Sequence, residues 1–173
     1  MIENERDIRT ANVIEAGRRM LTAARTAPKA KGLDMLECCL VIGEDIDRLA
    51  DEMMKLYGET SRNVFKRDSA NIRKAQCVVI IATQKGVMGL DCGHCGYRTC
   101  TEKPENVPCA FNSIDVGIAV GSACATAADL RVDTRVMYSV GMAAERLKLL
   151  GEGTYQYIAI PVSASSKSPF FDR

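Results

Sequence analysis

The chain is poor in aromatic residues and in histidine. It has no tryptophan, one histidine and an aromatic content of 5% in 173 residues. Proteins that bind single-stranded nucleic acid stack the bases on aromatic side chains along a basic groove. Here 23 Lys and Arg stand against 22 Asp and Glu, for a net charge of +1, so the stacking residues and the basic excess are both missing. We therefore expect no nucleic-acid partner.

Two common catalytic patterns are also absent. The single histidine, His94, lies inside a cysteine-rich segment, which excludes a Ser-His-Asp arrangement. No Walker-type or Gly-x-Gly-x-x-Gly loop follows an expected strand, so no sequence motif indicates that the protein binds a nucleotide phosphate. The chemistry of the protein must therefore come from other residues, and cysteine is the obvious candidate because the chain contains eight of them.

The start of the chain does not look like a targeting segment. Residues 1–7 are charged and of mixed sign, unlike the basic start and apolar run of a signal peptide. We also expect no apolar stretch near the roughly 20 residues that cross a bilayer. These features predict a cytoplasmic protein with no membrane partner. In a reducing compartment, metal or redox chemistry explains a high cysteine content better than a disulfide framework does.

Length and periodicity predict one domain over residues 1–173. A mass of 18.9 kDa with 47% hydrophobic and 26% charged residues is an ordinary globular composition. Alternating helices and strands favour an α+β fold (an α/β sandwich), with a central sheet covered by helices on both faces. We expect Gly58 to end the second helix and Asp68 to cap the third. The expected helices are 5–25, 44–58, 68–74, 114–130 and 142–150, and the expected strands are 36–42, 77–82, 133–140 and 155–162.

Residues 83–112 interrupt this pattern as an inserted, cysteine-rich loop. A two-residue gap between cysteines lets their thiolates converge on one centre, and Gly93 and Gly96 allow the left-handed backbone that such a turn needs. Four soft thiolates select zinc or an iron–sulfur cluster rather than magnesium or calcium. The candidate metal ligands are Cys92, Cys95, Cys100 and Cys109.

The spacing of these cysteines favours an iron–sulfur cluster over zinc. Structural zinc sites are commonly built from two short Cys-x2-Cys units, whereas only one such pair is present here. A cluster is larger than one ion, so its ligands are often spread unevenly along a loop. A structural zinc site remains the alternative. We interpret His94 as an exposed loop residue, and Cys38, Cys39 and Cys124 as packing thiols.

Residues 89–100 resemble a known four-iron motif. They read Gly-Leu-Asp-Cys-Gly-His-Cys-Gly-Tyr-Arg-Thr-Cys, similar to the Cys-Gly-x-Cys-Gly-Tyr-x-Thr-Cys motif of the Rnf electron-transport complex B subunit and of corrinoid iron–sulfur proteins. The resemblance implies a 4Fe-4S cluster. In those proteins the fourth cysteine usually lies further downstream, which leaves Cys77 and Cys124 as alternatives to Cys109.

The rest of the chain resembles a family of ferredoxin-domain-containing proteins with a nitroreductase-like fold. Segments 24–32, 41–45 and 137–141 carry the likeness together with the cysteine loop and the C-terminal Phe-Phe-Asp-Arg. The resemblance implies a nitroreductase-like sheet and a homodimer, and FMN as a second cofactor. Its implied FMN contacts are Arg25, Lys29, Lys31 and Arg173. The alternative for each is an ordinary solvent-exposed basic side chain.

Two functional hypotheses follow. The first is a 4Fe-4S redox protein that performs electron transfer or reductase chemistry, with FMN as an optional cofactor and an unidentified redox partner. The second is a non-catalytic binding or assembly module in which the four thiolates bind a structural zinc ion that stabilises the loop. The small-residue helix 114–130 and the apolar pair Phe170 and Phe171 offer more packing surface than one domain needs. We therefore expect a homodimer.

Overall fold

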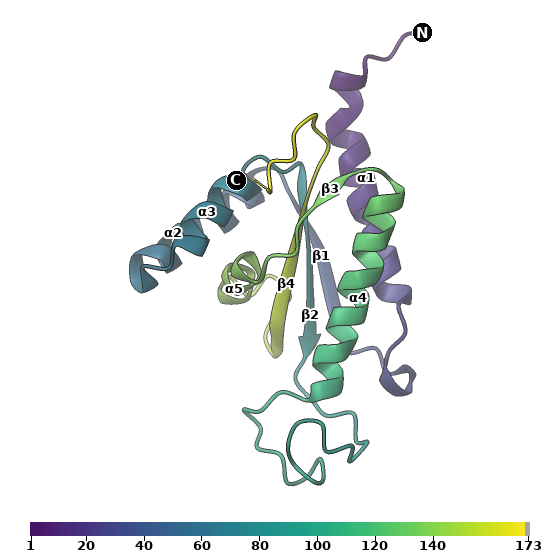
Figure 1. Cartoon of the computed structure of the whole chain (residues 1–173), viewed down its shortest axis with the longest axis vertical. Helices are drawn as coiled ribbons and strands as arrows, with labels where there is room; N and C mark the ends of the chain where they lie inside the picture. The colour runs from purple at the N-terminus through teal and green to yellow at the C-terminus, as the bar shows by residue number, and fades with distance from the viewer. Residues whose placement is uncertain (172–173) are drawn as a thin grey trace.

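The computed structural model describes residues 1–171, in which one antiparallel sheet lies between two groups of helices (Figure 1). Helices α1 and α4 cover one face of the sheet, and α2, α3 and α5 cover the other. The helices are α1 (Glu5–Thr26), a 3-10 turn η1 (Ala30–Gly32), α2 (Glu44–Thr60), α3 (Asn63–Ile72), α4 (Ala110–Asp129) and α5 (Tyr138–Arg146). The strands are β1 (Leu36–Ile42), β2 (Cys77–Gln84), β3 (Asp133–Thr134) and β4 (Thr154–Ser163).

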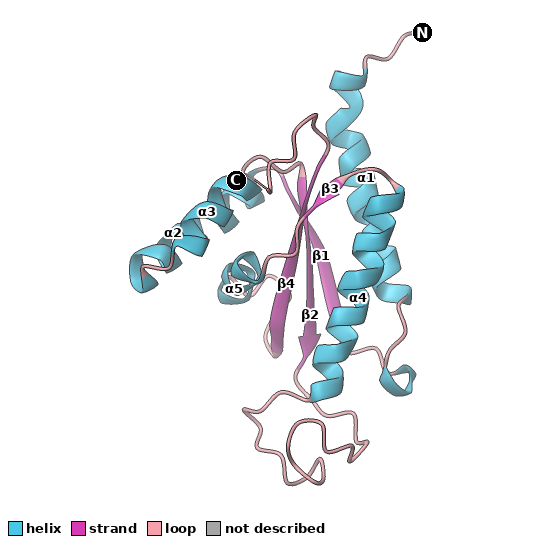
Figure 2. Ribbon diagram, in the orientation of Figure 1, coloured by secondary structure: helices cyan, strands magenta, loops and turns pink. Residues whose placement is uncertain are grey.

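The strand order is β1-β2-β4-β3, and every neighbouring pair is antiparallel (Figure 2). Strand β2 is paired on both sides, and helices cover both of its faces. This position explains why residues 77–83 are all buried and almost all apolar. The α+β sandwich with helices on both faces is thus confirmed.

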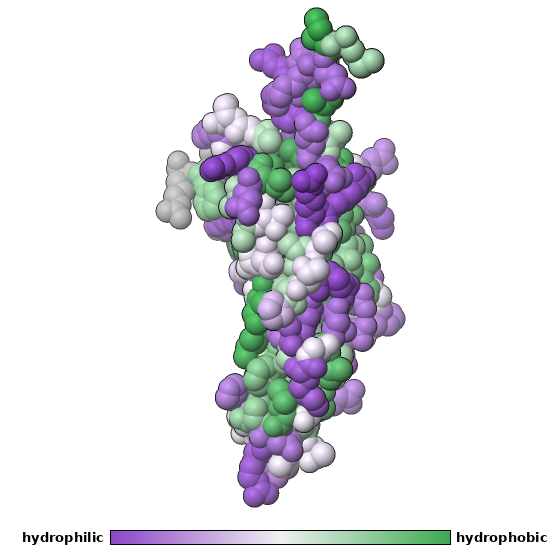
Figure 3. Space-filling model, turned by 90° about the vertical axis from the view of Figure 1, so that its right-hand side faces the viewer, coloured by the Kyte–Doolittle hydropathy of each residue, from purple (hydrophilic) through white to green (hydrophobic). Residues whose placement is uncertain are grey.

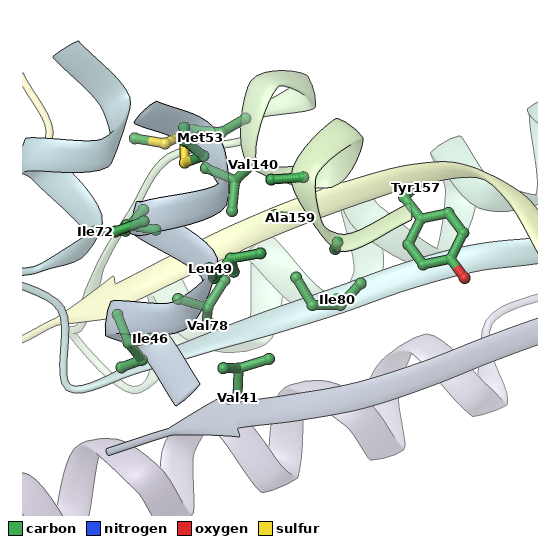
Figure 4. Packing of buried hydrophobic residues seen from close by; sticks show 14 of the residues in the cluster. Val41, Ile46, Leu49, Met53, Ile72, Val78, Ile80, Val140, Tyr157 and Ala159 are labelled. Atoms are coloured by element: carbon green, nitrogen blue, oxygen red, sulfur yellow. The ribbon is translucent and has the colours of Figure 1, made fainter. Parts of the chain in front are cut away.

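Each face of the sheet has its own hydrophobic core. Leu49, Met53 and Ile72 of the α2–α3 layer meet alternate residues of β1, β2 and β4 on one face (Figure 4). On the other face, Met20 of α1 and Ala123 of α4 pack against the intervening strand residues. Because successive strand residues point to opposite faces, one central strand supplies both cores.

One close contact fixes α5 against β4. A Cβ atom added at Gly141 would lie 1.9 Å from the carbonyl oxygen of Tyr157. The helix can approach the strand this closely only because residue 141 has no side chain. The contact is reinforced by two backbone hydrogen bonds between Met137, which precedes α5, and Ala159 of β4.

Several expected boundaries are wrong. Gly58 lies inside α2, which continues to Thr60 and ends with Ser61 in the left-handed region at φ 56°. Asp68 lies within α3 rather than at its start, and is buried with its carboxylate accepting a hydrogen bond from the Ser139 hydroxyl. The strand expected over 133–140 is limited to Asp133–Thr134. The last two helices begin at Ala110 and Tyr138, four residues earlier than expected in each case.

The expectation about apolar stretches also needs correction. By length and composition, α4 could cross a membrane, with 20 residues and a mean hydropathy of 1.2. A core helix passes the same test, and the buried Val116, Ala119 and Ala127 of α4 belong to the core shared with α1. The apolar tail is likewise only half exposed, because Phe170 is fully buried whereas Phe171 is 54% exposed.

Candidate metal centre in the cysteine loop

The cysteine loop lies at one end of the sheet, between the end of β2 and the start of α4 (Figure 1). It contains no regular helix or strand between residues 85 and 109. The loop is tied to the α1 side of the molecule by Lys31, whose Nζ donates to the carbonyl oxygen of Met88 at 3.2 Å. Met88 itself is buried, so it anchors the start of the loop.

All four candidate cysteines line one hollow in this loop. Cys92, Cys95, Cys100 and Cys109 surround it, with Val87, Tyr97 and Lys103 closing its sides. The hollow is narrow, with about 10 Å³ available to the centre of a water molecule. Within residues 1–171, no three His, Cys, Asp or Glu side chains are gathered closely enough to hold a single metal ion. The thiols therefore share one site without being spaced as ligands of one ion.

The chemistry of this donor set fits an iron–sulfur cluster. Tetrahedral zinc with Zn–S bonds near 2.3 Å requires its sulfurs to lie roughly 4 Å apart. A cluster places its cysteine ligands at the corners of a larger unit, as thiols spread around a hollow can do. The hollow would have to widen to admit it. Gly93 and Gly96, at φ 72° and 88°, are the points where this backbone turns.

Asp91 closes the loop from within. Its Oδ1 accepts a hydrogen bond of 2.6 Å from the backbone N–H of Cys100. Asp91 has a φ of 46°, in the left-handed region that Asp and Asn tolerate better than most residues. The bond shortens the distance between the two ends of the Cys92–Cys100 segment, which carries three of the four thiols.

Cys109 differs from the other three cysteines in its surroundings. It is buried, whereas the others are partly exposed, and it is the N-cap residue of α4. No side chain caps this helix start, and its first turn contains no acidic residue. Cys109 and Ala110 both line the hollow, so the N-terminus of α4, with its partial positive charge, borders it.

The other cysteines lie elsewhere and are poor ligands. Cys77 begins β2, at the end of the strand opposite the loop, and burial raises the pKa of its thiol to about 12. Burial also raises the pKa values of Cys38 and Cys39 to about 11 and that of Cys124 above its ordinary value. None of these four lines the hollow. Of the three candidates for the fourth ligand, Cys109 is the one that the fold brings to the site.

His94 lies between two of the proposed ligands but points to a neighbouring ring. It is exposed, and it stacks on Phe111 of α4 with ring centroids 5.6 Å apart and an interplanar angle of 13°. The stacking holds the tip of the loop against the first turn of α4. Sequence alone could not have paired these two residues, because no pattern links them.

The basic residues expected to contact FMN are engaged with the protein itself. Arg25 pairs with Asp34 at 2.7 Å and donates to the Leu36 carbonyl. The hydrogen bond to the Asp34 carboxylate raises the pKa of the Arg25 guanidinium. Lys29 donates to the carbonyl oxygens of Ala24, Arg25 and Ala27 at the end of α1.

The other two expected FMN contacts are Lys31 and Arg173. Lys31 has N–H donors left beyond its bond to the Met88 carbonyl. Arg173 lies outside the described residues. Arg25 and Lys29 thus have partners within the protein, and the FMN contacts stay a prediction.

Comparison with known proteins shows two levels of similarity. A family described as uncharacterized proteins containing a ferredoxin domain matches residues 105–173, a part that includes Cys109. An uncharacterized protein of Archaeoglobus fulgidus is 38% identical over 183 residues, covering 100% of this chain and 98% of that protein. The likeness to this relative therefore extends over the whole chain, including the cysteine loop.

Solved structures with a similar fold are distant in sequence. A nitroreductase with bound FMN from Desulfitobacterium hafniense DCB-2 has a TM-score of 0.62 at 16% identity, covering 96% of this chain and 92% of that one. A nitroreductase with bound FMN from Bacteroides fragilis NCTC 9343 has a TM-score of 0.63 at 12% identity, with coverages of 88% and 77%. At such identities the likeness shows the fold alone, and it confirms the nitroreductase-like architecture.

Proposed function

Because the chain belongs to the family of uncharacterized proteins that contain a ferredoxin domain, we propose that it is a cytoplasmic redox protein whose cysteine loop holds a four-iron cluster. The family description and the oxidoreductase neighbours both support a redox role. The finer assignment, a cluster rather than another metal, is carried by one observation: four thiols from one loop surround a single hollow.

The residues around the hollow have separate roles in this proposal. Cys92, Cys95, Cys100 and Cys109 hold the cluster, which supplies one-electron transfer when bound. Asp91 holds the segment of three cysteines closed through the N–H of Cys100. The N-terminus of α4 offsets the negative charge of the thiolates. Backbone N–H groups near Gly93 and Gly96 are candidates to donate to sulfur and so to set the potential.

We also propose that the protein is a homodimer that pairs through α4. The outward face of this helix exposes Ile114 and Ile118 by 43% and 40%. Gly117 precedes Ile118 and Gly121 follows it by one turn, and both have open space where a side chain would project. Figure 3 shows apolar residues gathered along the lower part of the molecule on the side where α4 lies. A helix of a second copy could pack closely on such a face.

The visible spectrum of protein purified without oxygen tests the cluster. We expect a brown protein with a broad absorption near roughly 400 nm that bleaches when dithionite reduces it. Cys95→Ser should remove most of this absorption, because it removes a ligand. Cys124→Ser is the matched control, since Cys124 lies outside the hollow and should leave the spectrum unchanged.

Two other results would change the proposal. A colourless protein that retains zinc would support the structural alternative, in which the loop is a metal clip. A yellow protein that releases a fluorescent flavin on denaturation would place FMN on this chain as well. Equal absorption in wild type and Cys95→Ser would contradict a cluster held by the loop.

A further inference from the structure

A second hollow lies beside the cysteine loop, on the side that faces the start of β4. It is formed by residues 85–87, which follow β2, by Tyr155 near the start of β4, and by residues 103 and 105–108, which lead to α4. About 510 Å³ of it is available to the centre of a water molecule, a size typical of small-ligand sites. Val87 and Lys103 line this hollow and the cysteine hollow alike, so the two are separated by a wall one side chain thick.

The hollow carries more positive than negative charge. Lys85 and Lys103 line it together with one acidic residue, Glu105. Lys103 is fixed in place because its Nζ donates to the carbonyl oxygens of Pro104 at 3.0 Å and Val107 at 2.6 Å. Neither bond neutralises the ammonium group, which keeps a third N–H for another acceptor.

Lys85 is the second cation of the site. Its side chain forms no salt bridge with any residue in the described part of the chain. It acts at longer range on Glu145. Burial raises the pKa of Glu145 above its ordinary value, and the ammonium of Lys85 offsets part of that rise. Glu145 does not line the hollow, so it does not take the place of a ligand there.

A hydroxyl group completes the polar lining. Tyr155 of β4 lines the hollow, and its oxygen accepts a hydrogen bond of 3.5 Å from Nδ2 of Asn112. Asn112 is fully buried, and the same Nδ2 group also faces the carbonyl oxygens of Gln84 and Gly86. These carbonyls fix which side of the amide is the donor. Because the Tyr155 oxygen acts as acceptor here, its proton is available to a ligand.

We propose that this hollow binds a small organic anion, with its carboxylate or phosphate near Lys85 and Lys103 and a carbonyl oxygen accepting from Tyr155. The ring of Tyr155 with Val87, Val107 and Pro108 provides apolar surface for the carbon frame. That such a ligand exchanges electrons with the neighbouring cysteine loop rests on the proposed function. Binding itself does not depend on it.

Calorimetric titration with two matched compounds tests the proposal on the full chain purified without oxygen. Para-acetylbenzoate carries a carboxylate and a carbonyl group, and para-acetylbenzamide has nearly the same shape without the charge. We expect the carboxylate to bind the wild type at least about fivefold more tightly than the amide, since only it forms charge-assisted hydrogen bonds. Lys85→Gln should abolish this preference, and Lys66→Gln, a remote exposed lysine, should preserve it.

Three further variants separate ligand binding from loop damage. Lys103→Gln should weaken the carboxylate by about fivefold, while Lys103→Arg keeps the charge and should stay within about twofold of wild type. Tyr155→Phe should weaken both compounds alike. Equal affinity for the two compounds, or no binding at millimolar concentration, would overturn the proposal. Carboxylate-selective binding by a protein that contains no iron would support the hollow and contradict the cluster.

Discussion

The carboxylate of Asp91 accepts a 2.6 Å hydrogen bond from the backbone N–H of Cys100, nine residues further along the chain. This bond joins the residue before the first ligand to the third ligand. It is the one side-chain hydrogen bond in the described residues that ties Asp91 to this segment, and it holds the turn through Gly93 and Gly96 closed. The arrangement makes Asp91 a positioning residue for the proposed metal centre.

Asp91→Ala should reduce the amount of metal that the protein retains. The substitution removes a hydrogen bond to a charged acceptor, worth about 1.5–3 kcal/mol, and places alanine at a left-handed φ. Asp91→Asn is the matched variant, because asparagine keeps an acceptor oxygen and tolerates that backbone. Iron content and the decay of visible absorption in air check the prediction. Equal retention in Asp91→Ala and wild type would show that the bond does not position the site.

Gly141→Ala should destabilise the fold by about 1–3 kcal/mol or more, because the new methyl group would overlap the carbonyl oxygen of Tyr157. Gly58→Ala is the control. Gly58 is an exposed glycine inside α2 with open space around it, so alanine there should stabilise the helix by about 0.5–1 kcal/mol. Urea unfolding of both variants measures the difference. A stable Gly141→Ala protein would mean that α5 can move away from β4.

Asp115→Asn should change how stability depends on pH. Both carboxylate oxygens of Asp115 accept from the Ala30 N–H at 3.1 Å, and burial raises the pKa of this carboxyl group. An acid with a raised pKa in the folded state costs stability when ionised and recovers it as pH falls through the folded pKa. The asparagine variant keeps an acceptor for Ala30. Its melting temperature relative to wild type should therefore be higher at pH 7 than at pH 4. A difference independent of pH would contradict the prediction.

Ile118→Glu should convert the proposed dimer to monomers, because it places a charge in the middle of the exposed apolar face of α4. Met142→Glu is the matched control. Met142 is similarly exposed, at 38%, but lies on α5 in the other helical layer. Sedimentation velocity at micromolar concentration should show a dimer for wild type and for the control. A monomeric wild type would overturn the dimer.

Elements with one strong local cause were predictable from the sequence. Residues 77–82 are apolar at every position because β2 is covered on both faces. An unbroken apolar run of this length predicts such a strand from the sequence alone. The cysteine loop was equally visible, since four thiols within a short irregular segment have few other uses. The convergence of the four on one hollow follows from that local spacing.

Features decided by distant partners were not predictable. Asp68 looks like a helix cap in the sequence, but its partner is Ser139, 71 residues away. Gly58 looks like a helix end, yet the buried face of α2 outweighs the roughly 1 kcal/mol that a glycine costs in a helix. Lys31 looks like a free cation, and only the fold brings its Nζ to the carbonyl oxygen of Met88, 57 residues away.

The second hollow is not predictable from the sequence, for the same reason. Lys85, Lys103 and Tyr155 come from three separate segments, and no spacing rule connects them. Asn112 gave no signal either, because a single asparagine near a helix start has many ordinary roles. A buried amide beneath a charged hollow becomes visible only when β2, β4 and α4 are placed together.

Quantification of iron, acid-labile sulfide and zinc per chain in anaerobically purified protein distinguishes a cluster from zinc. We expect about four iron and four sulfide per chain and little zinc, with both iron and sulfide falling sharply in Cys92→Ala. Cys38→Ser should match wild type, because burial raises the pKa of that thiol to about 11 and Cys38 lies outside the hollow. One zinc per chain without sulfide would contradict the account.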